Sequence, residues 1–316
     1  MKILNKKNLI LFIIILLAYL AVTFLMNMGI IDSYIQLNMV IIGVNIVLAI
    51  GLNLITGFTG QFSLGHAAFM AIGAYASGIM TAKLGMPFVV GIVAAALTAA
   101  LAGLLIGIPT LRLKGDYLAI ATLGFAEIIK IILLNNDYVG GAIGLNDIPQ
   151  YTNWTWLYFC VVATILVAHN FVNSYHGRAC IAIREDEIAA EAMGINTAYY
   201  KILAFTIGAF LAGIAGALYA NYFFFIKPDS FGFMKSIDIL VIVVFGGMGS
   251  ITGSIVGAIA LSLISVFLQG VPELRMVIYA VVLFLIMVYR PQGLMGDKEF
   301  KLFNRKGVLG GNVSSK

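Results

Sequence analysis

The chain has 316 residues, of which 61% are hydrophobic and only 10% are charged, whereas a soluble domain usually carries about a quarter charged residues. A water-soluble fold of this length could not bury so much apolar surface, so the composition excludes one and indicates a membrane protein. The formal net charge of +5 does not point to nucleic acid, because the basic residues form no stripe with interleaved aromatic side chains. Cys160 and Cys180 lack the spacing of a metal or redox site, and we expect neither a metal nor a cofactor.

Apolar stretches of spanning length recur along most of the chain. The first begins after Lys7 and is too long for the apolar part of a signal peptide, so we expect a membrane helix there. The stretch 236–268 is also apolar but is interrupted by a glycine-rich run, 246–254. The uninterrupted stretches cover residues 9–30, 37–56, 63–82, 88–110, 117–134, 155–174, 202–225 and 274–290.

Lys and Arg residues in the short loops set the expected orientation. If residues 1–8 are cytoplasmic, most of the 19 basic residues fall on the cytoplasmic side. The spans up to residue 225 then leave the chain outside near Pro228, and the last span returns it to the inside at Arg290. The interrupted stretch must therefore enter and leave on the same side, as a re-entrant hairpin or as two short spans.

These observations predict the fold class: all-α, a polytopic transmembrane helical bundle of 8–10 spans, with a broken or re-entrant segment near 236–268. Residues 9–295 would form a single transmembrane domain, which carries a cytoplasmic loop at 175–201. The N-terminus, 1–8, and a basic tail, 296–316, would both be cytoplasmic.

Two glycine-rich breaks mark the expected pathway, because irregular backbone at membrane depth is tolerated only where it is buried in protein or lines a cavity. The run 57–65 precedes one helix and the run 246–257 precedes another, which is either the trace of an internal repeat or a chance similarity. The candidate pathway residues in and around these breaks are Asn45, Asn53, Gly60, Ser63, His66, Glu127, Gly247 and Gly249.

Several of these residues also have a purely structural interpretation. Glu127 and Lys130 stand at i, i+3, so they could form an ion pair near a helix end or act as a gating group. His66 could be a hydrogen-bonded packing residue instead of a pathway residue. Asn45 and Asn53, eight residues apart on one helix face, could line a polar path or bond to neighbouring helices. The sequence leaves these alternatives open.

Small residues recur at four-residue spacing on the span that follows the cytoplasmic loop. The residues of this ridge are Ala209, Ala212, Gly213, Gly216 and Ala220. Such spacing predicts a close contact with another helix, because small side chains let helix backbones approach.

The cytoplasmic loop contains a short acidic helix, predicted for residues 184–194. Acidic residues begin it, where the helix dipole favours negative charge, and Gly194 suits a left-handed C-terminal cap. Glu187 and Glu191 share one face at i, i+4, with small apolar side chains beside them. A helix this short is not stable alone, so we expect a partner protein to bind it. Its candidate contact residues are Glu185, Asp186, Glu187, Ala189, Ala190, Glu191 and Gly194.

This loop resembles the coupling segment of ABC-importer permeases, in which a Glu-Ala-Ala core is followed shortly by glycine. The run Arg-Glu-Asp-Glu-Ile-Ala-Ala-Glu-Ala-Met-Gly-Ile-Asn, starting at residue 184, is similar to the version in permeases for branched-chain amino acids. The segment Lys-Gly-Asp-Tyr, which starts at residue 114, favours the M-type subunit of that system over its H-type paralogue. Segments that agree with the family, in chain order, are 51–57, 60–69, 113–125 and 289–294.

The resemblance implies a permease subunit in the cell (inner) membrane. It would pair with a second homologous permease subunit, sit on two ATP-binding-cassette ATPase subunits and receive leucine, isoleucine or valine from an extracytoplasmic substrate-binding protein. The sequence contains no Gly-Lys dipeptide and hence no P-loop, so the energy source must lie in a partner, and we expect no enzymatic activity. The polar, acidic loop 135–153 could meet the binding protein or merely be solvated.

Other functions remain as alternatives. A permease of related architecture for urea, amides or a sugar fits the same pattern, because the binding protein usually selects the substrate. A self-sufficient ion-coupled secondary carrier would need a chain of buried carboxylates, and apart from Glu127 the spans offer almost none. A membrane enzyme lacks support, since the sequence shows no paired carboxylates, histidine cluster or nucleophile motif.

Overall fold

The computed structural model describes residues 6–110, 113, 115–268, 277–278, 280–281, 284, 288–290 and 293–296. Within these residues the fold is all-α, as predicted, and the only β-type pairing is an isolated bridge between Leu145 and Ile226. The predicted last span, 274–290, and the basic tail, 296–316, lie largely outside the described residues.

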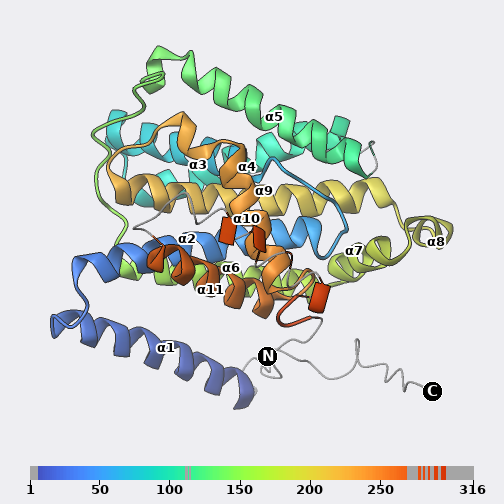
Figure 1. The fold of residues 1–316 in the computed structure, drawn as a ribbon, viewed down its shortest axis with the longest axis horizontal. Coiled ribbons are helices and arrows are strands. Elements are labelled where there is room, and N and C mark those ends of the chain that lie inside the picture. Colours follow the sequence, from blue (N-terminus) through green and yellow to red (C-terminus); the bar gives the residue numbers. More distant parts are fainter. Residues whose placement is uncertain are drawn as a thin grey trace.

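Helices account for most of the described chain (Figure 1). They are α1 (Lys6–Asn27), α2 (Ser33–Thr56), α3 (His66–Gly78), η1 (Ile79–Lys83), α4 (Phe88–Thr110), α5 (Asp116–Leu134), η2 (Asp137–Val139), α6 (Trp154–Asn173), α7 (Tyr175–Glu185), α8 (Glu187–Ala192), α9 (Thr197–Phe223), η3 (Pro228–Phe231), α10 (Phe233–Gly246) and α11 (Ile251–Phe267). Five of the described helices, α2, α4, α5, α6 and α9, are long and apolar enough to cross a membrane. Their bounds lie close to those of the predicted spans, because a long apolar run in a bilayer has few alternatives to a helix.

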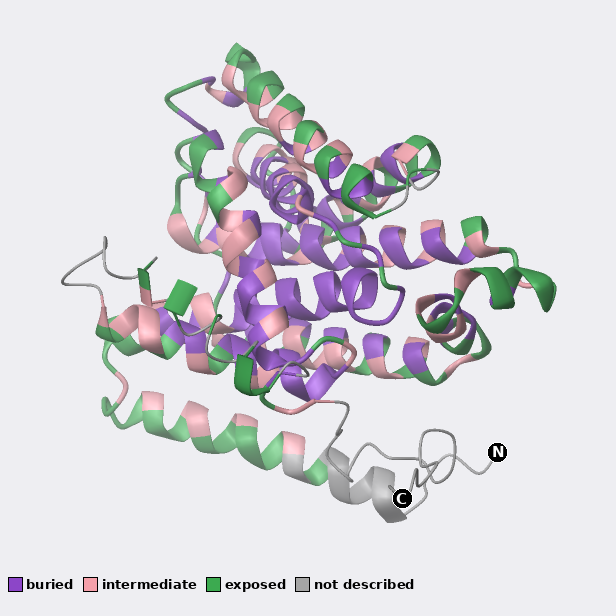
Figure 2. Ribbon diagram, turned by 45° about the vertical axis from the view of Figure 1, so that its right-hand side comes forward, coloured by how far each residue is buried: buried purple, intermediate pink, exposed green. Residues whose placement is uncertain are grey.

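Helix α9 forms the centre of the bundle and packs against α2, α3 and α4 (Figure 1). The pair α10 and α11, together with α6, covers α2, while α5 lies against α3 and α4 on the opposite side. Helix α1 lies at the periphery, where Tyr158 Oη donates a hydrogen bond of 2.6 Å to the carbonyl oxygen of Ile15. Figure 2 shows the consequence for burial: α2 and α9 are largely buried, whereas α1 and α8 are mostly exposed.

The small-residue ridge on α9 lies in close contact with its neighbours. A Cβ atom built on Gly213 would lie 2.5 Å from the carbonyl oxygen of Ala95 on α4. A Cβ atom built on Gly216 would overlap the carbonyl oxygen of Met70 on α3. The predicted close helix–helix contact is confirmed, and it involves two neighbours at once.

Helix α3 begins partway along the bundle instead of at its end. The chain leaves α2 in a turn and runs without regular structure to His66, three residues later than the predicted start of the span. Leu64 N–H donates to Thr122 Oγ1 on α5 (3.1 Å), and Ala67 N–H donates to Ser236 Oγ on α10 (3.2 Å). The first turn of α3 is therefore held by hydroxyl groups inside the protein, as a helix break at membrane depth requires.

The predicted interruption of 236–268 lies at residues 247–250, between α10 and α11. A Cβ atom on Gly253 would lie 2.6 Å from Gly246 O, and one on Gly257 would lie 2.5 Å from Ile242 O, so the two helices run antiparallel. The stretch thus turns back toward the end from which it came, as a re-entrant hairpin or two short spans would. Helix α10 has only 14 residues, fewer than the ~20 that usually span a bilayer, so the stretch is not two full-length spans.

Alanine at two glycines of the bundle should change stability in opposite directions. The methyl group of Gly216→Ala would overlap backbone atoms of α3, so we expect the free energy of unfolding to fall by about 1–3 kcal/mol. Gly124 on α5 has nothing within 4 Å of an added Cβ atom, so Gly124→Ala should be neutral or stabilising by up to about 1 kcal/mol through helix propensity. Thermal melting of the purified variants in detergent measures both effects. A Gly216→Ala protein that melts with the wild type would contradict the close contact.

Candidate functional site: the coupling loop and the helix breaks

The loop 175–201, predicted to be cytoplasmic, folds as two helices, and not with the single helix predicted for 184–194. Helix α7 ends at Glu185, and α8 starts after Asp186, whose backbone is extended. The Asp186 carboxylate accepts hydrogen bonds from the N–H groups of Ile188 (2.9 Å) and Ala189 (3.0 Å), so Asp186 is the N-cap of α8. The placement of Glu185 in the short helix is therefore wrong.

The C-terminal end of α8 follows the prediction. Gly194 has a φ of +84°, in the left-handed region that glycine adopts without strain. Ile195 N–H donates to the carbonyl oxygen of Ala190 (3.1 Å), which closes the last turn of the helix. Gly194 is thus the expected left-handed residue that ends α8.

Ala190 fastens α8 to the rest of the protein. Its side chain is 5% exposed and belongs to a small cluster from α7 and α9: Ala179, Cys180, Ile183, Tyr200 and Ala204. Burial raises the pKa of the Cys180 thiol to about 12, so this cysteine stays a neutral packing group. Ala190 is therefore buried within the chain, whereas Ala189 is exposed, and the contact of either residue with a partner stays a prediction.

An ion pair makes a second attachment of α8. Glu187 Oε2 lies 2.7 Å from Lys201 Nζ in the first turns of α9, and the two side chains are only 30% and 11% exposed. The Glu187 carboxylate is engaged within the chain, so its predicted contact with a partner stays a prediction. Glu191 is exposed.

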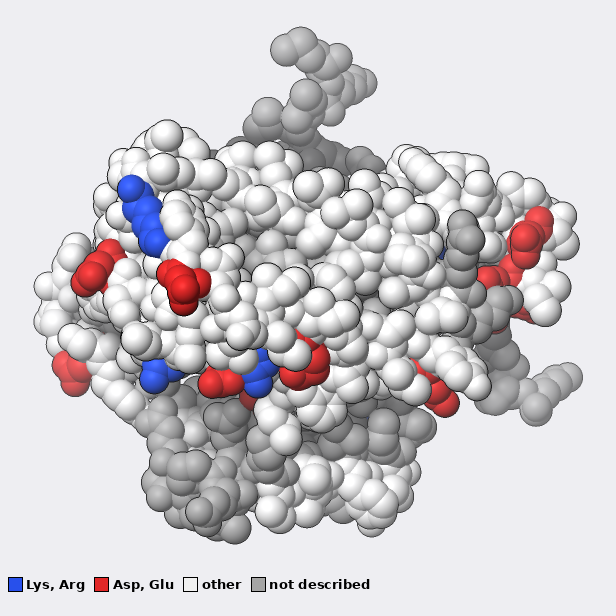
Figure 3. All heavy atoms as spheres, turned by 90° about the horizontal axis from the view of Figure 1, so that it is seen from above, with Lys and Arg blue, Asp and Glu red and all other residues white. Residues whose placement is uncertain are grey.

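The outward side of α8 is apolar with an acidic surround. Ile188 is 77% exposed and Met193 is 83% exposed, at the end of the molecule beyond the tips of α2 and α9 (Figure 1). Acidic side chains gather at this same end in Figure 3. Large apolar side chains this exposed on a charged segment indicate a protein-binding surface. We call it the coupling face; its exposed residues are Asp186, Ile188, Ala189, Glu191, Ala192 and Met193.

Asn53 holds the break between α10 and α11 against α2. Its Nδ2 donates to Ser250 O (2.8 Å) and to Ser254 Oγ (2.7 Å), and its Oδ1 accepts from Gly249 N–H (2.8 Å). The side chain is 1% exposed. Of the two readings that the sequence leaves open, bonding to a neighbouring helix is the one that the geometry supports.

The two glycine-rich breaks contact each other. A Cβ atom on Gly57 would overlap both Asn53 Oδ1 and Gly249 N, so only glycine allows this approach. Gly60, Gly247 and Gly249 all have positive φ values, of +70°, +120° and +85°. The structure thus brings Asn53, Gly60, Gly247 and Gly249 of the predicted pathway set into one region.

The other predicted pathway residues lie apart from this region or are sealed within the bundle. Asn45 Nδ2 donates to Ser262 Oγ on α11 (3.0 Å). Ser63 is 1% exposed and His66 is 0% exposed. The His66 ring lies against the backbone of α2, with Nε2 3.2 Å from the position of a Cβ atom on Gly51. Their part in a pathway stays a prediction.

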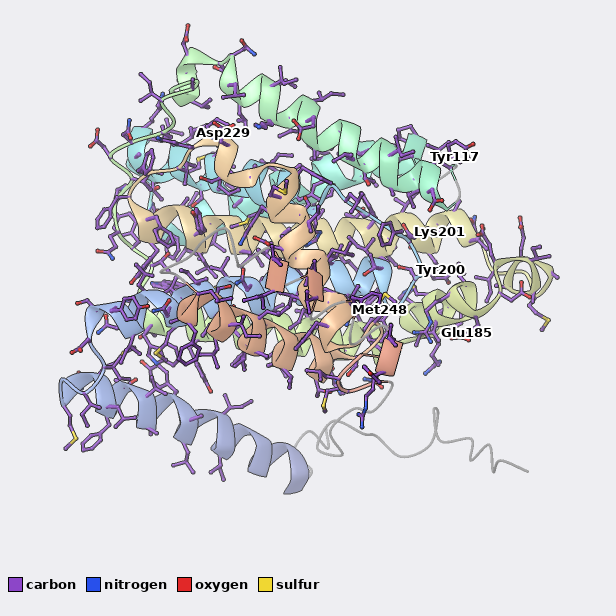
Figure 4. All side chains as sticks on the ribbon, in the orientation of Figure 1. Tyr117, Glu185, Tyr200, Lys201, Asp229 and Met248 are labelled. Atoms are coloured by element: carbon purple, nitrogen blue, oxygen red, sulfur yellow. The ribbon has the colours of Figure 1, made fainter. Side chains whose placement is uncertain are left out.

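Glu127 does not pair with Lys130. Lys130 Nζ lies 3.1 Å from the carboxylate of Asp229 on η3, so the ion pair joins α5 to the segment before α10. Figure 4 places Asp229 at the opposite end of the molecule from Glu185 and Lys201. Glu127 itself is partly exposed on α5, and its pathway role also stays a prediction.

Two basic residues that are absent from the predicted site residues, Lys201 and Arg184, organise the site. Lys201 binds Glu187, and Gln61 Nε2 donates to the Lys201 carbonyl oxygen (3.2 Å), which ties the first break to α9. Arg184 Nη1 donates to the carbonyl oxygen of Gly57 (2.9 Å) at the end of α2. Arg184 adjoins an acidic run and Lys201 stands at the start of an apolar stretch, and neither position reveals a partner in the sequence.

Asn53→Ala should destabilise the protein by about 1–3 kcal/mol, because it leaves the buried polar groups of Gly249 and Ser250 without their partner. Asn38→Ala on the same helix should cost less, since Asn38 Nδ2 bonds only to the Tyr34 carbonyl oxygen of its own helix. Thermal melting in detergent compares the two. Equal losses of melting temperature would contradict a specific role of Asn53.

Glu187→Gln should loosen α8, because Lys201 would remain largely buried without its counter-charge. We expect a local loss of about 1–2 kcal/mol and amide hydrogen exchange in α8 roughly ten times faster. Glu191→Gln is the matched control, since this exposed carboxylate should not affect exchange. The same exchange rates in both variants would show that the ion pair does not hold α8.

Comparison with known proteins identifies a family and several relatives of this chain. Residues 34–287 match the family described as "Branched-chain amino acid transport system / permease component". The chain is 37% identical over 301 residues to the high-affinity branched-chain amino acid transport system permease protein LivM of Escherichia coli (strain K12). The aligned region covers 84% of this chain and 71% of that relative. LivM of Salmonella typhimurium is 38% identical over 285 residues, which covers 79% of this chain and 67% of that protein.

The H-type relatives are more distant. LivH of Escherichia coli (strain K12) is 29% identical over 285 residues, covering 80% of this chain and 91% of the relative. No solved structure matches the chain at a significant level. The resemblance to the M-type subunit is therefore confirmed, and the chain belongs to the family of permease components of branched-chain amino acid transport systems, as a LivM-like member.

Proposed function

We propose that this chain is the M-type, membrane-spanning permease subunit of an ATP-driven importer for branched-chain amino acids in the cell (inner) membrane. The observation that carries the proposal is the coupling face, where Ile188 and Met193 project beyond the bundle from a helix that is fixed to α9. The names of the LivM relatives supply the substrate class.

The ATPase activity belongs to separate subunits in this proposal. Two ATP-binding-cassette subunits bind the coupling faces of this chain and of a second, homologous permease subunit of the LivH type. ATP binding draws these subunits together and moves α8, which the Glu187–Lys201 ion pair and Ala190 connect to the central helix α9. The cycle is then a population shift between outward-open and inward-open states, driven by the different affinity of the ATPase subunits for each.

The opposite end of the molecule presents a preformed surface for an extracytoplasmic binding protein. Leu145 and Ile226 exchange backbone hydrogen bonds of 3.0 Å, and Ile148 N–H donates to Phe224 O (3.0 Å), so the loop after η2 is fastened to the chain that follows α9. A fixed loop costs little conformational entropy when a partner docks. In this orientation the coupling loop and both chain termini are cytoplasmic.

An ion-coupled carrier is not favoured. No Asp or Glu side chain among the described residues is buried, so that part of the chain offers no buried relay of carboxylates. Permeases for urea, amides or sugars are not favoured either, because the family match and the LivM relatives all concern branched-chain amino acids.

The test is leucine uptake by the reconstituted complex. Proteoliposomes containing this chain, the second permease and both ATPase subunits should take up labelled leucine when the binding protein is outside and ATP inside. The chain alone should take up none under a proton or sodium gradient. Gradient-driven uptake by the chain alone, or ATP-driven uptake of urea instead of leucine, would overturn the proposal.

A variant pair tests the coupling face in the same preparation. Ile188→Asp combined with Met193→Asp should lower both ATPase copurification and uptake by at least about tenfold, since two apolar contact residues become charged. Ile143→Asp, which alters a side chain 74% exposed at the opposite end, should leave ATPase copurification unchanged.

A further inference from the structure

A single arginine lies where the coupling loop meets both helix breaks. Arg184 stands in the last turn of α7, with its side chain 29% exposed. Its Nη1 donates a 2.9 Å hydrogen bond to the carbonyl oxygen of Gly57, the residue that ends α2. A cation is favoured at a helix C-terminus, where carbonyl groups lack partners and the dipole is negative.

The same side chain also contacts the second break, residues 247–250 between α10 and α11. A Cβ atom on Gly249 would lie 2.5 Å from Arg184 Nη1, so the guanidinium group rests directly on the Gly249 backbone. Its aliphatic part covers Gly60, where an added Cβ atom would lie 3.3 Å from Arg184 Cγ and 3.5 Å from Arg184 Cα. One side chain of the coupling loop therefore lies across both breaks.

Glu185 fixes the orientation of this guanidinium group. Its Oε1 accepts hydrogen bonds from Arg184 Nε (3.0 Å) and Nη2 (2.5 Å), which leaves Nη1 directed at Gly57. A planar guanidinium can serve the carboxylate and the carbonyl group at once, whereas a lysine ammonium lacks this fork geometry. In Figure 4, Glu185 and Met248 of the second break lie at the same end of the molecule.

We propose that Arg184 is the positioning residue that makes the two helix breaks follow the coupling loop during transport. The proposal rests on the proposed function and adds the route by which movement of α8 reaches the membrane region. Helices α7 and α8 share one packed cluster, so a displacement of α8 carries Arg184 with it. Arg184 then moves Gly57 and Gly249, which Asn53 already binds together.

Thiol labelling of the second break tests this route. Met248 is 44% exposed, and the native Cys160 and Cys180 are buried, so Met248→Cys provides a reporter on the break with little background labelling. In the complete complex, ATP with vanadate should change the maleimide labelling rate of this cysteine roughly fivefold or more, and Arg184→Gln should reduce the change to less than about twofold. Arg184→Lys should restore only part of the response.

Arg178→Gln is the matched control, because Arg178 is exposed on the same helix and donates only to Asn173 O (3.4 Å). It should keep the full labelling response. Three outcomes would each overturn the proposal. They are a full labelling response in Arg184→Gln, no labelling response in Met248→Cys with Arg184 intact, and dissociation of the ATPase subunits from the Arg184→Gln complex. The last of these would make Arg184 part of the docking surface instead.

A glycine variant probes the same contact while keeping the arginine. The methyl group of Gly249→Ala would displace the guanidinium group, so this variant should lose the labelling response as Arg184→Gln does, and the double variant should lose no more. Gly85→Ala controls for backbone strain, since Gly85 has a φ of +60° and nothing within 4 Å of an added Cβ atom. Additive losses in the double variant would contradict a shared route.

Leucine uptake in the same preparation separates the two proposals. If wild type shows no ATP-driven leucine uptake, the proposed function fails. If wild type transports leucine and Arg184→Gln keeps both its uptake and its labelling response, only the role of Arg184 fails.

Discussion

The need to satisfy backbone polar groups where water is absent shapes this structure more than any other constraint. Two interruptions, before α3 and between α10 and α11, free N–H and C=O groups inside the bundle. The chain supplies partners from distant elements: Thr122 for Leu64 and Ser236 for Ala67. Asn53 does the same for Gly249 and Ser250 with a single amide group. The breaks are therefore held by specific side chains, and each can shift only if its partner shifts as well.

Glycine makes these contacts possible in two different ways. On α9, Gly213 and Gly216 have ordinary helical backbone and serve by lacking a side chain, which lets α3 and α4 approach. In the breaks, Gly60 and Gly249 combine close contact with a positive φ that a larger residue would adopt only under strain. The first kind lets helices pack closely, and the second kind lets the chain turn sharply between helices.

The sequence predicts five long helices, α2, α4, α5, α6 and α9, and the hairpin of α10 and α11 well, because both depend on apolar length and glycine breaks, which need no knowledge of neighbours. The sequence does not predict whether a charged side chain faces solvent or pairs with a residue far away in the chain. Glu187 and Glu191 look alike in the sequence, yet only Glu187 lies near Lys201. Lys130 had Glu127 one turn away and instead pairs with Asp229. The extended backbone of Asp186, which separates α7 from α8, was also hidden, because Asp suits a cap as well as a first turn.

In the proposed function, the attachment of α8 is what lets a helix of six residues act on the bundle. Such a helix has almost no stability of its own, so its position is set by its contacts: Asp186 at its start, Ala190 in the cluster with α7 and α9, and Glu187 on Lys201. These contacts reach the central helix directly and, through Arg184, both breaks. In the proposed function, a partner that moves the exposed side of α8 therefore acts on the central helix α9 and on both breaks at the same time, as coupling of separate ATPase subunits to a membrane pathway requires.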